Sequence, residues 1–344
     1  MLKVISWENH AQWNNIINSF MDEDVYFSYE YFASSLLIDL GEPILFYYED
    51  ENGRVAYPVV KRKIENIAGE ELYDITTPYG YGGPLVSYLN EEKELLYKFR
   101  MEINKYCNKN DIVSEFVRFH PVLGNEKNLE KDLDLDVIYI RNTIEMKLQQ
   151  GEELLSEIPG KTRNMIRKAI RNGVEVKKLD KDESIKDFLA IYHSTMNRND
   201  AADYYYFNEN YFKETFELLN PNIHMFGAFV EEKIIAATLI FTYGDFMHYH
   251  LSGALREHLS LGANNLLLYE IAEWGRKQGM ESFHLGGGYF GNEDGLYRFK
   301  KSFSQLEPLN FYIGKKIHNE DLYRMLVSEK GITEDNGFFP LYRK

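Results

Sequence analysis

Apolar and polar positions alternate between strand-like and helix-like spacing along the whole chain. In the first half, two strand-like runs, ILFYYED and RVAYPVVKRK, flank Asn52-Gly53, a dipeptide typical of a hairpin turn. The stretch 91–107 repeats its apolar residues at helical spacing, and the strand-like runs IVSEFVRFHP and VIYIRNTIEMKL follow it. The pattern predicts an α/β (α+β) protein with mixed sheets.

The second half predicts a fuller set of elements. We expect a helix near 151–172, a strand at 174–179, helices near 183–197 and 208–219, three closely spaced strands, a helix at 262–279 and a last strand in SFHLGGG. Gly279 is expected at the end of the long helix, where glycine commonly terminates helices. We place a boundary between 135 and 150, which gives an N-terminal domain, 1–140, and a C-terminal domain, 141–344.

Composition and charge indicate a folded globular protein and argue against a general nucleic-acid-binding protein. With 344 residues, 44% hydrophobic and 15% aromatic, the chain is long and apolar enough for two folded domains with a core in each. Its formal net charge of −15 argues against a protein that coats nucleic acid, so we expect no DNA partner. Local clusters of Lys and Arg are therefore informative.

The number of cysteines and the lengths of the apolar runs indicate in which cellular compartment the protein is expected. The single cysteine, Cys107, excludes a disulfide framework and a cysteine-based zinc site. The N-terminal stretch MLKVISWENHAQW lacks the apolar core of a signal peptide, and the longest apolar run, 234–241, is far shorter than the roughly 18 residues of a membrane span. We expect a cytoplasmic protein, with peripheral contact at the inner face of the membrane through a local basic or aromatic patch as the alternative.

The segment HLGGGYFGNEDGLYRFKKSF (284–303) combines glycines with a basic cluster. Gly286, Gly288 and Gly291 satisfy the dinucleotide fingerprint G-x-G-x-x-G, but that fingerprint opens a βαβ unit, for which the remaining chain has no room. The Gly-Lys-Thr at 160–162 is not a phosphate loop, because Leu155 stands where that loop needs glycine. Neither nucleotide motif is therefore expected to bind a nucleotide.

Several separated motifs resemble those of one protein family. They are TTPYGYGGP at 76–84, SEFVRFHP at 114–121, KTRNMIRKAIRNGVEV, the tyrosine run before YFNENYF, and HLGGG followed by LYRFKKSF. Together they span nearly the whole chain and resemble the Fem family (FemA, FemB, FemX) of peptidoglycan-bridge aminoacyltransferases, within the tandem GNAT acyltransferase superfamily.

This resemblance implies two GNAT-like domains in tandem, each a mixed, mostly antiparallel sheet flanked by helices. It also implies an enzyme that transfers an acyl or aminoacyl group to an amine. Some Fem proteins carry a long helical arm in the second domain, and this sequence has no insertion that could form one. Binding of transfer RNA through such an arm is therefore not supported.

The first candidates for the chemistry are Lys300 and Lys301. Acyl transfer to an amine passes through a tetrahedral intermediate whose developing oxyanion needs hydrogen-bond donors. In helical geometry the two lysines project about 100° apart, so one can face a site while the other faces solvent. The pair Phe299-Lys300 matches the family motif in which a lysine stabilises the intermediate, so the resemblance favours Lys300. The alternative is a solvated basic turn.

Backbone and charged groups beside these lysines are candidates for substrate binding. Gly287 and Gly288 would let a substrate approach the backbone closely; the alternative is a strand end packed tightly against a helix. Arg298 adds a further cation. Asp294 is expected to order the turn rather than to react.

A second candidate is the basic helix that contains Arg163, Arg167 and Arg171 at four-residue spacing. Ile166, Ala169 and Ile170 are expected to form its apolar face. Residues 161–178 hold seven Lys or Arg and a single acid, a local excess that suits a nucleotide pyrophosphate, a lipid pyrophosphate or the acceptor end of a transfer RNA. The alternative is an ordinary helix surface, and Lys61 is a weaker candidate for a phosphate contact.

Tyrosines are the third group of candidates, because their rings stack on sugars and peptides while their hydroxyls hydrogen-bond. The alternative for each is burial in the core. His248 and His250 alternate onto one strand face, but no third ligand is suitably spaced, so no metal site is expected. The tyrosines proposed to bind substrate are Tyr79, Tyr81, Tyr206, Tyr211 and Tyr249.

The donor depends on the junction before the long helix. In coenzyme A-dependent GNAT domains a Q/R-x-x-G-x-G/A loop holds the pyrophosphate at this helix N-terminus. Here Gly262, Ala263 and Asn264 occupy the cofactor-binding position, but the spacing of the motif is degenerate. That favours an aminoacyl-tRNA over an acyl-CoA as donor substrate, with no tightly bound cofactor.

Three functions therefore stand open. The leading hypothesis is transfer of an aminoacyl group from aminoacyl-tRNA to the stem-peptide amine of a UDP-linked or lipid-linked muramyl peptide. The second is an acyl-CoA-dependent N-acyltransferase that acts on an amino sugar or peptide of the cell envelope. The third is a non-catalytic binding module on the same fold, for which Lys300 would be dispensable.

Overall fold

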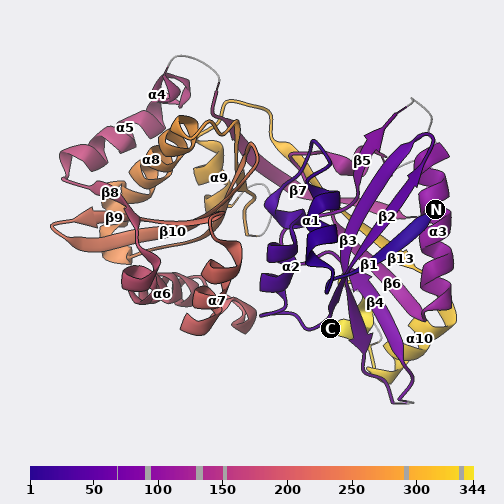
Figure 1. The fold of residues 1–344 in the computed structure, drawn as a ribbon. Helices are drawn as coiled ribbons and strands as arrows, with labels where there is room; N and C mark the ends of the chain where they lie inside the picture. Colours follow the sequence, from indigo (N-terminus) through magenta and orange to yellow (C-terminus); the bar gives the residue numbers. More distant parts are fainter. Residues whose placement is uncertain (68, 90–93, 129–134, 150–152, 290–293, 333–336) are drawn as a thin grey trace. The chain divides into compact units, whose positions relative to one another are not determined.

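The computed structural model describes the whole chain apart from residues 68, 90–93, 129–134, 150–152, 290–293 and 333–336. It divides into two compact units, Met1–Ile140 together with Asn310–Lys344, and Arg141–Leu309 (Figure 1). The point of division, between Ile140 and Arg141, lies within the strand β7 (Asp136–Lys147). Among the described residues, no helix has the length and apolar character needed to span a bilayer.

The first unit is built on a mixed sheet with the strand order β1-β2-β3-β4-β6-β13, and β5 pairs with β3. The described pairings between these strands are antiparallel except that of β4 with β6, which is parallel. Its strands are β1 (Leu2–Ser6), β2 (Glu42–Asp50), β3 (Gly53–Ile64), β4 (Leu72–Thr76), β5 (Leu85–Tyr88), β6 (Ile112–Arg118) and β13 (Leu309–Ile317), and its helices are α1 (His10–Ile17), α2 (Tyr29–Ser35), α3 (Glu94–Lys109) and α10 (Glu320–Glu329). Short 3-10 turns cover Val25–Phe27, Asn125–Asn128 and Leu341–Arg343.

Alternation along β2 explains why helices cover both faces of this sheet. Leu45 packs with Trp13 of α1 and Phe32 of α2, whereas its neighbour Phe46 packs with Phe99 of α3 on the opposite face. The predicted hairpin forms, but Glu51 and Asn52 make the turn, and Gly53, with φ of +149°, already pairs with Asp50.

The C-terminal segment departs from the predicted domain range 141–344, because Asn310–Lys344 belongs to the first unit. Its strand β13 pairs antiparallel with β6, so that Ile313 lies opposite Arg118. Tyr323, Leu326 and Tyr342 are buried in one apolar cluster with Val113 of β6. The pairing joins residues nearly two hundred positions apart, which local spacing cannot predict.

A charged network is buried in the first unit. Arg100 donates from Nη1 and Nη2 to the two carboxylate oxygens of Glu115 at 2.8 and 2.9 Å, and the hydroxyl of Tyr57 donates to Oε1 at 3.0 Å. Burial alone would raise the pKa of Glu115, but Arg100 and His318, whose Nε2 lies 3.2 Å from Oε2, hold that pKa below its usual range.

The second unit has the strand order β7-β12-β11-β10-β9-β8. Its pairings are antiparallel except for β11 with β12, which is parallel. Its further strands are β8 (Glu175–Leu179), β9 (Ile223–Val230), β10 (Lys233–Tyr243), β11 (Phe246–Ala254) and β12 (Ser282–Gly286), and its helices are α4 (Leu154–Glu157), α5 (Gly160–Arg171), α6 (Lys181–Arg198), α7 (Glu209–Leu219), α8 (Ala263–Lys277) and α9 (Gly295–Lys301). The 3-10 turns are Asp203–Tyr205 and Arg256–Leu261.

Side-chain caps explain where several of these helices begin. The carboxylate of Asp180 accepts hydrogen bonds from the backbone of Asp182 and Glu183 at the start of α6, and Asn208 caps α7 in the same way. The helix predicted over 151–172 is instead interrupted at Pro159, between α4 and α5. Proline restricts the residue before it to extended geometry, and Ile158 has ψ of 133°.

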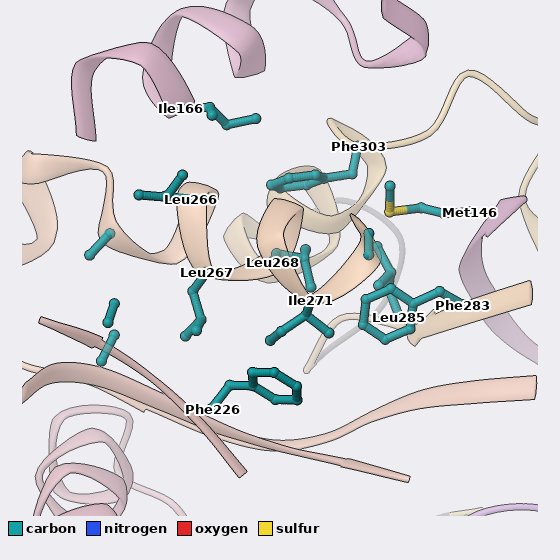
Figure 2. Close-up of a cluster of buried hydrophobic side chains, with 14 of the residues drawn as sticks. Met146, Ile166, Phe226, Leu266, Leu267, Leu268, Ile271, Phe283, Leu285 and Phe303 are labelled. Atoms are coloured by element: carbon teal, nitrogen blue, oxygen red, sulfur yellow. The ribbon is translucent and has the colours of Figure 1, made fainter. Parts of the chain in front are cut away.

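The core of the second unit lies between α8 and the sheet, with α5 on the outer side of α8 (Figure 2). Leu267 and Ile271 point from α8 towards the strand that carries Phe226, and Ile166 of α5 lies on the other side. The helix α8 is therefore covered by the sheet on one side and by α5 on the other. Ile170, which the spacing assigned to the apolar face of α5, is 56% exposed, so that part of the prediction is wrong.

Candidate active site

The end of β12 passes into a glycine strip, Gly286–Gly288. The parallel pairing of β11 with β12 runs from Phe246 opposite Ser282 to His248 opposite His284. The register against β7 then shifts between His284 and Gly286, and Gly286 adopts φ of +74°, a left-handed conformation that favours glycine. The strip is therefore redirected at the point where the β11–β12 pairing ends.

Two cationic side chains hold successive carbonyls of the glycine strip. Lys300 donates from Nζ to the carbonyl of Gly287 at 2.8 Å, and Arg141 donates from Nη1 to the carbonyl of Gly288 at 2.9 Å. Side chains are sterically excluded here, because a Cβ on Gly287 would lie 2.9 Å from the carbonyl oxygen of Asn142. A Cβ on Gly288 would lie 2.4 Å from Oδ2 of Asp294.

Lys300 is presented by α9, whose first turn is capped by Asp294. Oδ1 of Asp294 accepts from the backbone of Tyr297 at 2.7 Å, so the carboxylate orders the turn. Lys300 is only 7% exposed, and its Nζ lies 5.6 Å from the centre of the Tyr249 ring. Burial lowers the pKa of Lys300 to about 7; the carboxylate of Asp294 opposes this shift and the guanidinium of Arg141 adds to it.

The neighbours of Lys300 on α9 have different surroundings. The ammonium of Lys301 donates to the carbonyl of Leu306, just after the helix. The ring of Phe299 packs against the core and lies 5.4 Å from that of Phe303, and Arg298 is exposed. Of the three residues predicted to be catalytic, Lys300 is the one that contacts the glycine strip.

The basic helix α5 presents its cations unevenly. Arg163 donates to the carbonyl of Ser156 at 3.0 Å and so holds the turn from α4, whereas Arg167 and Arg171 are exposed. Thr162 donates to the carbonyl of Ser302 at 2.7 Å, which fastens α5 to the residue after α9. The contact of Arg163 therefore holds α4 and α5 together.

The predicted tyrosines of the second unit lie in aromatic surroundings. Tyr206 donates its hydroxyl to Oδ1 of Asn197 at 2.8 Å. Tyr211 stacks on Phe207 at 4.4 Å, and burial raises the pKa of its phenol to about 12. Burial also raises the pKa of Tyr249, whose ring faces the ammonium of Lys300, to about 12.

The predicted contacts in the first unit are engaged with their neighbours. Nζ of Lys61 lies 3.9 Å from the centre of the Tyr73 ring. The carbonyl of Tyr79 accepts from the hydroxyl of Tyr31 at 2.5 Å, and the ring of Tyr81 lies 5.3 Å from that of Tyr26. These tyrosines belong to an aromatic cluster of the first unit.

The junction before α8 keeps one feature of the predicted cofactor loop. Gly262 has φ of +81°, and a Cβ there would lie 2.8 Å from the carbonyl oxygen of Met165 on α5, so glycine is required. Ala263 begins α8 directly, with Asn264 in its first turn. The carbonyl of Gly262 accepts from Asn265 and Leu266 at 3.0 and 3.2 Å.

Sequence reasoning missed three residues around the glycine strip. They are Arg141, Tyr289 and Asn199. In addition to its hydrogen bond to Gly288, Arg141 donates to the carbonyl of Tyr289 at 3.2 Å. The hydroxyl of Tyr289 accepts from Nδ2 of Asn199 at 2.9 Å. Arg141 stands alone in a strand-like run 147 positions before Gly288, so no motif pointed to it. Its proximity emerges only from the pairing of β7 with β12.

Comparison with known proteins identifies this unit. Residues 160–301, which include α5, α8, the glycine strip and Lys300, match the family model of the acetyltransferase (GNAT) domain. Most of the second unit is therefore similar to a GNAT acetyltransferase domain. A search of curated protein sequences found no match to the chain.

The GNAT fold extends over both units. The crystal structure of FemX is similar to this chain with a TM-score of 0.69 and 14% identity, over 94% of this chain and 99% of that one. The C-terminal domain of a putative lysylphosphatidylglycerol synthetase from Agrobacterium fabrum gives a TM-score of 0.56 at 13% identity, over 96% and 98%. A tandem GNAT protein from the clavulanic acid biosynthesis pathway gives 0.51 at 9%, over 93% and 99%.

These comparisons confirm the predicted fold class, a tandem of two GNAT-like units with the fold of the Fem-like proteins. The match to the acetyltransferase (GNAT) family model also confirms that the chain is an acyltransferase. At such low identity the similar structures bear on the fold alone, so donor and acceptor are inferred from the site.

Proposed function

We propose that the protein transfers an aminoacyl group from aminoacyl-tRNA to the stem-peptide amine of a UDP-linked or lipid-linked muramyl peptide. The observation that carries the proposal is Lys300, a buried lysine fixed against a glycine strip in a GNAT domain. The similarity in fold to FemX and the family motifs in the sequence support the same choice.

In this reaction the amine nitrogen attacks the ester carbonyl carbon and forms a C–N bond. The carbonyl oxygen becomes an oxyanion, the carbonyl re-forms as the bond to the ribose oxygen breaks, and the proton that the amine loses ends on that oxygen as the ribose hydroxyl. An ammonium group has three N–H donors, and that of Lys300 uses one on the carbonyl of Gly287, so a further N–H can stabilise the oxyanion. A site that is closed to water strengthens this contribution.

A second candidate, transfer from acyl-CoA, is favoured by the junction before α8. The left-handed Gly262 leads directly into the first turn of a 15-residue helix, whose N-terminus suits a phosphate group. Roles for Arg163, Arg167, Lys61 and the predicted tyrosines in binding the substrate stay predictions. Since charged transfer RNA is a cytoplasmic molecule, the first candidate also places the reaction in the cytoplasm.

The test supplies both donors to the same acceptor. Purified protein is incubated with a UDP-linked muramyl pentapeptide and either a mixture of aminoacylated transfer RNAs or acetyl-CoA, and the acceptor is weighed by mass spectrometry. We expect an increase by one or more aminoacyl residues with transfer RNA only. An acetylated acceptor with release of free CoA would support the second candidate.

Two matched variants test the residue that carries the proposal. Lys300→Met should reduce the rate at least 100-fold, because the intermediate loses a donor worth about 3 kcal/mol. Lys301→Met, the control on the same helix, should stay within threefold of the wild type. Equal rates for Lys300→Met and the wild type, or no product from either donor, would overturn the proposal.

A further inference from the structure

We infer that Arg141 of β7 is a positioning residue: it clamps the backbone after the glycine strip and so fixes the carbonyl of Gly287 that holds the ammonium of Lys300. The inference deepens the proposed function and rests on it for the catalytic role of Lys300. It concerns a residue that neither the motifs nor the family match includes, since the match begins at residue 160.

The clamp has two parts that act on three consecutive residues. The guanidinium of Arg141 donates to the carbonyls of Gly288 and Tyr289 at 2.9 and 3.2 Å. Its aliphatic stem packs against Gly287, because Cδ and Cγ lie 3.1 and 3.7 Å from the place where a Cβ of Gly287 would be. One side chain therefore holds the strip by its stem and its head.

The opposite side of the strip is held from α9. Lys300 donates to the carbonyl of Gly287, and the carboxylate of Asp294 lies against Gly288, where it leaves no room for a Cβ. The strip has no side chains of its own to lock its conformation, and glycine backbone is the most flexible of all. Without Arg141, the carbonyls of Gly288 and Tyr289 would lose their hydrogen-bond donor from β7. The neighbouring carbonyl of Gly287, which accepts from Lys300, would then become mobile.

Charge gives Arg141 a second effect on the same lysine. Among the residues that the structure describes, the charged or titratable groups that act on Lys300 are Arg141 from β7, Asp294 at the cap of α9 and the ring of Tyr249 from β11. The positive charge of Arg141 disfavours a second positive charge at Lys300 and lowers the pKa of its ammonium, while Asp294 raises it. Burial is the main cause of the lowered pKa of Lys300, and Arg141 adds to it while it also fixes the backbone that holds the ammonium.

Two substitutions separate the clamp from the charge. Arg141→Lys keeps the charge but has a shorter side chain without Nη1, the nitrogen that donates to both carbonyls, whereas Arg141→Gln loses the charge as well. We expect kcat to fall about 10- to 100-fold in both variants, with KM for either substrate within threefold. Arg324→Gln changes an exposed arginine of α10 in the first unit and should leave both constants unchanged.

The protonation of Lys300 is read without any substrate. In protein labelled with 13C-lysine, the Cε resonance of Lys300 is assigned by its loss in Lys300→Met and titrated between pH 5 and 10. Arg141→Gln should shift the midpoint upwards by about 0.5–1 pH unit, and Arg141→Lys should leave it within about 0.2. Amide exchange at Gly287–Tyr289 should accelerate at least tenfold in both variants.

The outcomes distinguish the two proposals. If the resonance and the exchange change as expected while no aminoacyl product forms with the wild type, the positioning role stands and the proposed function fails. If Arg141→Gln folds, by circular dichroism, with an unchanged Lys300 midpoint and unchanged exchange, the inference is overturned. Should Arg141→Gln not fold, Arg141→Lys decides, and unchanged exchange and kcat in that variant overturn it equally.

Discussion

Replacement of Lys300 by methionine should change the pH dependence of stability in a defined direction. The pKa of Lys300 is about 7 in the folded protein against a usual value of 10.5. Between these two values the unfolded chain binds more protons than the folded one, so the free energy of unfolding of the wild type rises with pH. Below pH 7 the destabilisation by the buried ammonium is fully present, and above pH 10.5 it is absent.

The size of the effect follows from the shift. A lowering from 10.5 to about 7 corresponds to about 5 kcal/mol at most. Between pH 7 and 9 the wild type should recover about 2–3 kcal/mol of this, whereas Lys300→Met has no ammonium to titrate. Methionine keeps an unbranched apolar chain in the same space, and the hydrogen bond that it loses to Gly287 contributes a pH-independent term.

The assay is urea unfolding of the wild type, Lys300→Met and the control Lys301→Met at pH 6, 7, 8 and 9, at constant ionic strength. Relative to the wild type, Lys300→Met should be more stable at pH 6 than at pH 9, by about 2–3 kcal/mol. The difference in the free energy of unfolding between wild type and variant at one pH cancels the contributions of all other titrating groups, which the two proteins share. A wild-type minus Lys300→Met difference that stays constant within 0.5 kcal/mol, as an order-of-magnitude limit, would refute a depressed pKa at Lys300.

Two further substitutions test the packing of the glycine strip in the second unit and the buried ion pair in the first unit. Gly288→Ala places a Cβ 2.4 Å from Oδ2 of Asp294, so we expect at least a tenfold loss of activity and a cost of about 1–3 kcal/mol, whereas Gly295→Ala, which meets no atom within 4 Å, should be tolerated. Wild-type kinetics and urea midpoint for Gly288→Ala would contradict this. Glu115→Gln leaves the buried guanidinium of Arg100 without its counter-ion and should cost about 3–5 kcal/mol by urea unfolding; a cost below about 1 kcal/mol would show that the pair is not buried as described.

Local patterns predicted most elements of the fold, because each depends on neighbouring residues. The hairpin at Asn52-Gly53 formed with a turn shifted by one residue, and the long helix predicted at 262–279 is α8, Ala263–Lys277, with Gly279 at φ of +86° after its end. The break at Pro159 was missed, although proline in a helical pattern signals it.

The candidate site was predictable only where a motif carries it. Lys300 was found because it stands in a family motif, but its burial and its contact with Gly287 depend on how α9 folds back onto β12. Arg141 could not be found, since a single arginine in a strand has no local signature. Ile170 shows the converse, because helical spacing assigned it to a buried face that α8 does not cover.

The return of the C-terminal segment to the first unit has a consequence for synthesis on the ribosome. About 190 residues separate the end of β6 at Arg118 from its partner β13, which starts at Leu309. At 5–20 residues per second, that delay lasts roughly 10–40 s. Throughout it, the edge of β6 lacks the strand that later covers it, and open strand edges invite pairing with other chains. The GNAT domain is thus fully synthesised before the first unit can close, and a chain that is released near residue 309 would carry a complete GNAT domain and an unfinished sheet.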